Sequence, residues 1–276
     1  MAIGDISLSA SARANLTALT ATTNLLAQTQ EHLSTGKTVN SASDNATAYF
    51  ASQGFLNSAN DLNNVKNSLS SALESVNSFD NSIADVTSVI TQLQGLATQA
   101  LGTTDTNTRA GLASQFNALT QQLDGMVNDA TFNGSNLLNS TGNTLVVFFN
   151  ETNTTALTIT GVNITSAGLL TTAGSTASSS WANAANIQTS QSFLLTALST
   201  LRTDAAQFGG NATLIQTRQD FTSNLITSLQ NASSDLTQAD TNTEGANLQA
   251  LQAQDQLGIV SLGISGTLEQ SILRIL

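Results

Sequence analysis

The chain has 276 residues, a formal net charge of -11, and neither cysteine nor proline. A chain of this length can bury a substantial core, but without cysteine it can form neither a disulfide framework nor a thiolate metal site. Its seven basic residues are scattered, so no basic patch is available to neutralise nucleic-acid phosphates. Proline costs about 3 kcal/mol in a helix interior, so a chain that lacks it can form very long helices.

No stretch of about 20 apolar residues occurs, so the sequence predicts no membrane insertion. The first residues also lack a basic segment followed by an apolar run, so no cleavable secretion signal is predicted. If the protein leaves the cell, it needs an export route that does not read such a signal.

Residues 6–33 form the first predicted helix, because apolar side chains recur there in steps of three, four and seven. The segment has few charges and many threonines, so the helix is marginal in isolation and needs a packing partner. The residues of this stripe that we expect to join helices are Leu8, Leu16, Leu19, Leu26 and Leu33.

Residues 45–101 predict a single long helix that follows good N-cap residues and stops at Gly102. Its apolar spacing alternates between three and four, as in a coiled coil. Lys66 and Asp80 lie on this seam, where such residues either form a solvated rim or set the register with a partner helix. A third helix is expected from Asp105 or Thr106 to about residue 128.

The middle of the chain changes character. Asn133-Gly134 is a turn signal, and the β-branched and aromatic residues near 143–161 predict a small β-hairpin. Residues 165–182 are rich in Ser, Thr, Ala and Gly, so we expect a small exposed loop anchored locally by Trp181.

Helix is predicted again from Ala184 to about Ala239, interrupted by a break at 208–210, where Phe is followed by two glycines. The last segment carries two apolar stripes and ends without a polar tail. Its expected contact residues are Leu248, Leu251, Ile259, Leu262, Leu268, Ile272 and Leu276. The predicted fold class is therefore mainly α: a long antiparallel helical bundle or coiled coil formed by both chain ends, with a small β-hairpin excursion.

The sequence contains few residues or motifs that could support catalysis. His32 is the only histidine, so neither a zinc site with N and S ligands nor a Ser-His-Asp triad is expected. No phosphate-binding or dinucleotide-binding glycine motif is present. We therefore predict no enzyme activity, no catalytic residue, no metal and no cofactor.

Three strings of residues match one family. Residues 31–46, Glu-His-Leu-Ser-Thr-Gly-Lys-Thr-Val-Asn-Ser-Ala-Ser-Asp-Asn-Ala, resemble a signature of the bacterial flagellins. Residues 96–100, Leu-Ala-Thr-Gln-Ala, and 131–138, Thr-Phe-Asn-Gly-Ser-Asn-Leu-Leu, are similar to further flagellin motifs. Towards the other end, the family's C-terminal region resembles Arg218, Leu225 and Leu229, the stretch 235–244 and the apolar end at Leu276. With these, the matches occur in the family's order and span nearly the whole chain. The sequence thus resembles a short flagellin, the structural subunit of the bacterial flagellar filament.

The resemblance implies an organisation and a set of partners. Residues 1–42 and 237–276 would form a terminal coiled-coil domain lining the inner tube of the filament, and residues 43–236 a helical rod domain outside it. The subunit would polymerise with itself, or together with paralogous flagellins, into a helical tube used for swimming. It would meet the flagellar export apparatus, an export chaperone, the filament cap and hook-junction proteins, and it would reach the extracellular filament without a cleaved signal peptide.

One departure from the family concerns recognition by an innate immune receptor. Many flagellins carry an Arg and a Glu at the positions of Gln92 and Gly95, just before the motif that begins at Leu96. The missing charges predict weakened activation of that receptor.

Two rival functions remain open at this point. A hook–filament junction protein shares the paired-end design, and the strings at 33–46 and 132–134 favour the filament subunit instead. A secreted helical translocator would insert into host membranes, and the lack of a long apolar hairpin argues against it.

Overall fold

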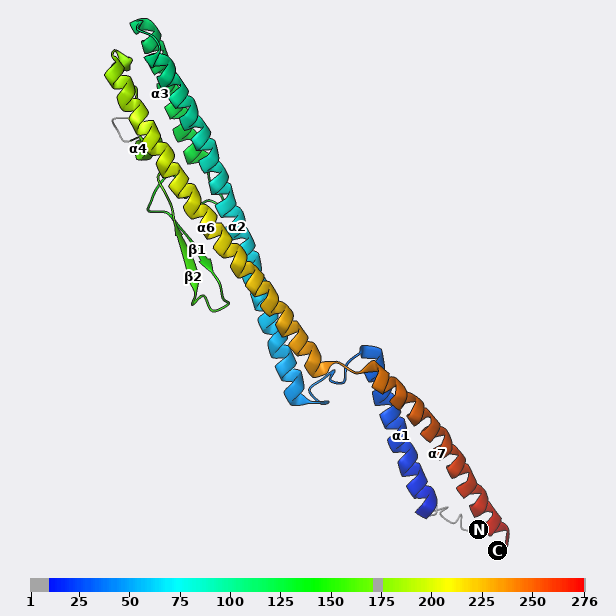
Figure 1. Ribbon diagram of the computed structural model, residues 1–276. Helices are drawn as coiled ribbons and strands as arrows, with labels where there is room; N and C mark the ends of the chain where they lie inside the picture. The colour runs from blue at the N-terminus through cyan, green and yellow to red at the C-terminus, as the bar shows by residue number, and fades with distance from the viewer. Residues whose placement is uncertain (1–9, 171–175, 276) are drawn as a thin grey trace. The chain divides into compact units, whose positions relative to one another are not determined.

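The computed structural model describes residues 10–170 and 176–275. Contacts divide the chain into two units (Figure 1). The end unit comprises Met1–Ser58 and Ser228–Leu276, and the central unit comprises Ala59–Thr227. Each unit is therefore considered by itself.

The end unit contains α1 (Ala10–Thr35) and α7 (Thr241–Ile275), which pack side by side (Figure 1). The first predicted helix is thus confirmed from Ala10 onward. Its threonines are tolerated because their hydroxyls donate to carbonyls one turn earlier, as from Thr20 to Leu16 O at 2.8 Å and from Thr22 to Ala18 O at 3.0 Å.

Two long helices contribute to both units. They are α2 (Ala46–Leu101) and α6 (Ala184–Thr237). Within the end unit, the buried Ser52 of α2 and the buried Ser233 of α6 share a hydrogen bond of 2.7 Å between their hydroxyls. The predicted long helix at 45–101 is confirmed almost residue for residue, because Asn45 Oδ1 accepts from Ala48 N and so caps it.

The central unit holds the hydrophobic core. It is built from α2, α3 (Thr106–Asp129) and α6 (Figure 1). The seam predicted on α2 is buried, with Leu69, Val76 and Ile90 each fully enclosed. On the same seam Lys66 is half-buried, and its Nζ donates to Ser223 Oγ of α6 at 3.2 Å. This contact agrees with the register-setting interpretation of Lys66.

The turn between α2 and α3 is fixed by two side chains. Asp105 accepts a hydrogen bond from Thr108 N at 2.9 Å and caps the start of α3. Arg109 Nε donates to Ala100 O at 3.1 Å and to Thr103 O at 2.8 Å. The arginine therefore satisfies carbonyls that the end of α2 leaves without helical partners.

The predicted break at 208–210 is wrong, because α6 continues without interruption from Ala184 to Thr237. Phe208 is 1% exposed and packs edge-on against Phe79 of α2, with ring centroids 6.4 Å apart. Burial of an aromatic ring on one side of the helix contributes more than the roughly 1 kcal/mol that each glycine costs. Packing thus overrides local propensity at Gly209 and Gly210.

The predicted hairpin is confirmed as β1 (Thr144–Phe148) and β2 (Ala156–Thr160), paired antiparallel with Thr144 opposite Thr160. Val147 and Ile159 are buried, while Val146 and Phe148 remain exposed. At Asn133-Gly134 both φ angles are positive, and the flanking Phe132 and Ser135 exchange backbone hydrogen bonds of 2.8 and 3.0 Å. The Asn-Gly turn signal was therefore correct.

Residues 165–182 do not form a wholly exposed loop. The described part contains α4 (Ser166–Leu169) and the short helix η1 (Ser178–Trp181). Trp181 is fully buried, lies 4.9 Å from Phe116 between ring centroids, and donates from Nε1 to Ser190 Oγ at 3.1 Å. The single tryptophan thus joins the unit's core, because its ring finds an aromatic partner and its N–H an acceptor.

Candidate functional site: the paired chain ends

The two chain ends meet along α1 and α7, which run antiparallel. Near the start of α1, Asn15 Nδ2 donates to Ser261 Oγ at 3.1 Å and to Ser265 Oγ at 3.3 Å. Farther along, a Cβ added at Gly258 would lie 2.9 Å from Leu19 Cδ1, so the glycine permits a close approach of the two helices. At these three contact points the two helices meet through small and polar residues.

The predicted contact residues fall into three groups. Half-buried side chains are Leu19, Leu26, Leu248, Leu251 and Leu262. Exposed side chains are Leu16, Leu33, Ile259 and Leu268. Leu8 and Leu276 lie outside the described residues, and Ile272 lies on α7 with its side chain outside them.

Further exposed apolar side chains on α7 share one face of that helix. Leu257 is 68% exposed, and Val260 and Ile264 are 59% and 56% exposed. Together with Leu268 they follow steps of three, four and four, which place them on one helix face. The predicted contact residues did not include Leu257, Val260 or Ile264, nor Leu25 and Phe50, whose side chains are exposed too. The signal for Leu257 was its spacing from Val260.

One carboxylate interrupts the apolar character of α7. Asp255 is half-buried, and its Oδ1 is enclosed without a hydrogen-bond partner. A buried polar atom that lacks a partner costs free energy. The carboxylate therefore weakens the packing of α7 in the single chain.

Backbone pairing fixes the junction between the helices, which we define as residues 32–45 and 237–244. Gly36 has φ of +68°, a left-handed conformation that ends α1 and that glycine adopts readily. Thr38 N then donates to Thr237 O at 2.7 Å, and Ala239 N donates to Gly36 O at 2.9 Å. The segment after α1 is thereby held in register with the segment before α7.

Two aspartates fold the junction locally. Asp44 accepts hydrogen bonds from the backbone N–H groups of Ser41 and Asn40, each at 2.9 Å, and these bonds lower the pKa of Asp44. Asp240 accepts from the backbone of Thr243 and so caps α7, which lowers the pKa of Asp240. Asp44 thus holds a turn in place, and Asp240 holds the start of α7.

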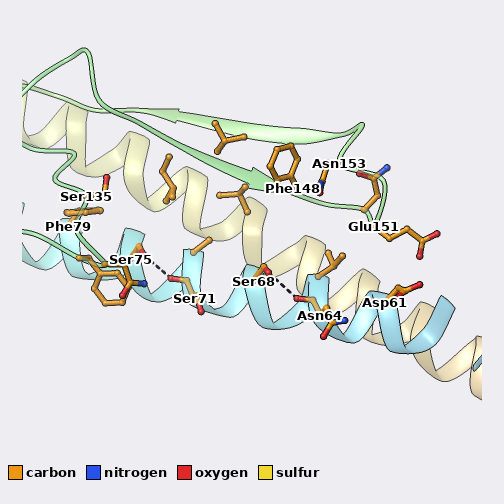
Figure 2. A pocket seen from close by; sticks show the side chains of 18 residues that line it. Asp61, Asn64, Ser68, Ser71, Ser75, Phe79, Ser135, Phe148, Glu151 and Asn153 are labelled. Carbon is orange, nitrogen blue, oxygen red and sulfur yellow. Dashed lines mark hydrogen bonds between the residues drawn. The ribbon is translucent and has the colours of Figure 1, made fainter. Parts of the chain in front are cut away.

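A groove in the central unit lies between α2 and the hairpin and has a volume of about 920 Å³ (Figure 2). Its floor on α2 is polar and carries Asn64, Ser68 and Ser71. Glu151 on the hairpin and Asp61 on α2 stand at the same end of the groove, as Figure 2 shows. Its lining residues include neither histidine nor cysteine.

The residues predicted to weaken receptor recognition lie on the outside of the central unit. Gln92 and Gly95 are exposed and Leu96 is half-buried. They line a shallow groove with Gln115 and Gln122 of α3. Its walls carry amides and apolar groups, and no lining residue is charged.

Within residues 10–170 and 176–275, no group of three or more His, Cys, Asp or Glu side chains could hold a metal ion. None of the helices in these same residues is long and apolar enough to cross a membrane. The features that stand out are apolar faces and helix pairing. They are typical of a class: a helical structural protein whose paired chain ends expose apolar side chains.

Comparison with known proteins identifies the family within that class. A family model described as the bacterial flagellin N-terminal helical region matches residues 6–143. Flagellin FljM of Caulobacter vibrioides is 30% identical over 277 residues, covering 99% of this chain and 98% of the relative. A flagellin of Brucella melitensis is 30% identical over 295 residues, covering 98% of each. The chain belongs to the bacterial flagellin family.

Membership establishes the general function. The protein is a structural subunit of the flagellar filament, an extracellular polymer that serves swimming motility. The family is a structural one. They self-assemble, and several curated relatives are paralogues from one organism. The alternative of a hook–filament junction protein is not favoured by these matches.

Proposed function

We propose that the end unit polymerises and that the central unit is its folded carrier. The observation that carries this proposal is the sparse burial of the end unit. Its buried hydrophobic residues, within the described part of the chain, are only Ala12, Val39 and Ala239. Its exposed large hydrophobic residues are Leu16, Leu25, Leu33, Phe50, Leu236, Leu257, Ile259, Val260, Ile264 and Leu268.

Neighbouring copies of the chain would bury these side chains in the filament. Burial of one large apolar side chain contributes about 1.5–3 kcal/mol, so several of them together can offset the cost of ordering two marginal helices. In this mechanism the helices of the ends gain their stability when the subunit enters the filament, and folding is coupled to assembly. The contact residues would be the predicted apolar residues of α1 and α7.

In the assembled filament, residues 1–42 and 237–276 would line the inner tube and residues 43–236 would form the rod outside it. The contact-based boundary differs slightly, since it assigns residues up to Ser58 and from Ser228 onward to the end unit. We therefore propose that the first turns of α2 and the last turns of α6 belong with the polymerising part.

Export follows from the same properties. Ends with few charges and little burial can be threaded unfolded through the flagellar export apparatus, without a cleaved signal peptide. An export chaperone would cover the apolar C-terminal stripe before secretion. The filament cap and hook-junction proteins would meet the subunit during assembly.

The test is deletion of residues 248–276. The truncated protein should remain soluble, monomeric and helical, because the core of the central unit does not involve these residues. Circular dichroism, light scattering and electron microscopy after salt-induced polymerisation measure the outcome. Filaments formed by the truncated protein at the wild-type concentration would refute the proposal.

A point variant supplies the matched control. Leu195→Ser removes a side chain that is 63% exposed on the central unit, so it changes surface apolarity without touching the end unit. It should polymerise like the wild type.

We further propose that the uncharged surface at Gln92 and Gly95 weakens recognition by the innate immune receptor. Restoring both charges with Gln92→Arg and Gly95→Glu should increase stimulation in a cell reporter assay. Both positions are exposed, and a Cβ at Gly95 would meet nothing within 4 Å, so the fold should tolerate the changes. Full stimulation by the unmodified protein would contradict the proposal.

A further inference from the structure

An ion pair joins the two terminal helices at the junction. His32 Nδ1 lies 3.1 Å from Glu244 Oε1, although 212 positions separate them in the chain. Both side chains are only 14% exposed. It is the only ion pair between side chains in the described residues, and it involves the only histidine of the chain.

The two partners lie at helix ends of opposite polarity. His32 lies in the last turn of α1, where the negative end of the helix dipole attracts a cation. Glu244 lies in the first turn of α7, where the positive end attracts an anion. A cation at position 32 and an anion at position 244 therefore complement both helix ends and each other.

The surrounding charges act in the same direction. Asp44, on the segment after α1, lies within electrostatic reach of His32: the pKa of Asp44 is lowered chiefly by its backbone hydrogen bonds from Ser41 and Asn40, and to a lesser degree by attraction to His32. Asp240 begins α7, and Glu31 precedes His32 on α1. Lys37 is the one nearby base of the junction, and its side chain is exposed.

We propose that this pair is a proton-operated latch that fastens α1 to α7 when His32 is protonated, so that mild acid promotes assembly. The latch rests on the proposed polymerising role of the end unit. Histidine is the side chain whose charge ordinarily changes between pH 5 and 8. When the imidazole is neutral, the carboxylate of Glu244 no longer has a cation beside it on α1. No other ionisable side chain makes a hydrogen bond or ion pair with His32 in the described chain.

The latch is distinct from the general effect of net charge. Acid also reduces the repulsion between subunits whose formal charge is -11, and that effect would promote assembly with any residue at position 32. The diagnostic quantity is therefore the ratio of critical concentrations at pH 8 and pH 5.5, compared between the wild type and variants of the pair.

The experiment measures the critical concentration of the full-length protein by sedimentation of filaments at both pH values. His32→Gln removes the titrating group, and Glu244→Gln removes its anionic partner. In the wild type the ratio should exceed that of either variant by about threefold to tenfold, the range expected for a partly buried cation at a helix C-terminus. His32→Arg keeps a permanent cation, so its ratio should fall to that of His32→Gln.

Lys37→Gln is the matched control, because it removes a base of the same junction that does not contact Glu244. Its ratio should equal that of the wild type. Equal ratios in the wild type, His32→Gln and Glu244→Gln would overturn the latch and leave the polymerising role intact. Failure of the wild type to polymerise at both pH values would instead contradict the proposed function, and the latch with it.

Discussion

The two units of this chain use the same amino-acid types in opposite ways. In the central unit Leu69, Phe116 and Leu194 are fully enclosed, because α2, α3 and α6 share one hydrophobic core. In the end unit, leucines of α1 and α7 are half-buried or exposed. Two helices can bury only one stripe each, whereas a helix among several neighbours can bury most of its surface. The comparison supports the proposal that the central unit folds alone and that further copies complete the end unit.

The strongest test of this comparison is a cavity in the central core. Phe116→Ala should reduce the free energy of unfolding by about 3–5 kcal/mol, because Phe116 is fully buried and packs against Trp181. Chemical denaturation of the monomer, followed by tryptophan fluorescence, measures the loss. A loss below about 1 kcal/mol would mean that the central unit is not the stable part.

The second test substitutes an exposed apolar residue of the end unit. Ile264→Ser should leave the unfolding of the monomer within about 0.5 kcal/mol of the wild type, because the side chain is already 56% exposed. It should raise the critical concentration of assembly by about tenfold, the equivalent of one lost buried apolar contact of ~1.5 kcal/mol. Unchanged assembly would remove Ile264 from the proposed interface.

A smaller effect of opposite sign is expected at the glycine pair of α6. A Cβ at Gly209 or Gly210 would meet nothing within 4 Å, and neither residue has a positive φ. Gly209→Ala should therefore stabilise the central unit by about 0.5–1 kcal/mol. Gly161→Ala is the contrasting control, because its Cβ would lie 2.6 Å from Ser140 O and 2.9 Å from Leu137 O. That variant should destabilise the hairpin instead.

The smallest expected effect is a dependence on acid that both units share. Hydrogen bonds lower the pKa of Asp44, Asp105 and Asp240 from the ordinary 3.8. A carboxylate whose pKa is lower in the folded state stabilises the fold above its unfolded pKa, and this contribution is lost as the pH falls through the folded value. Burial raises the pKa of Asp204, which therefore acts in the opposite direction.

Replacement of Asp44, Asp105 and Asp240 by asparagine checks this dependence. Asparagine caps helices about as well as aspartate but carries no charge. The triple variant should show a smaller fall in thermal stability than the wild type between pH 4 and pH 2. An identical fall would place the acid sensitivity elsewhere in the chain.

The flagellin motifs and the long helical periodicities could be recognised from the sequence because they depend on interactions between residues close together in the chain. Asn45 and Asp105 mark helix starts, and Asn133-Gly134 marks a turn, since each residue satisfies or bends its own neighbouring backbone. The period of the apolar residues likewise placed α2 and α7 without reference to the rest of the chain.

Tertiary structure decided the features that depend on distant partners. Phe208 keeps α6 intact across two glycines because Phe79 of another helix meets it, and Trp181 is buried because Phe116 and Ser190 receive its ring and its N–H. The pairing of His32 with Glu244 joins opposite ends of the chain. Sequence spacing fixes which face a side chain lies on, whereas only the packed chain decides what that face meets.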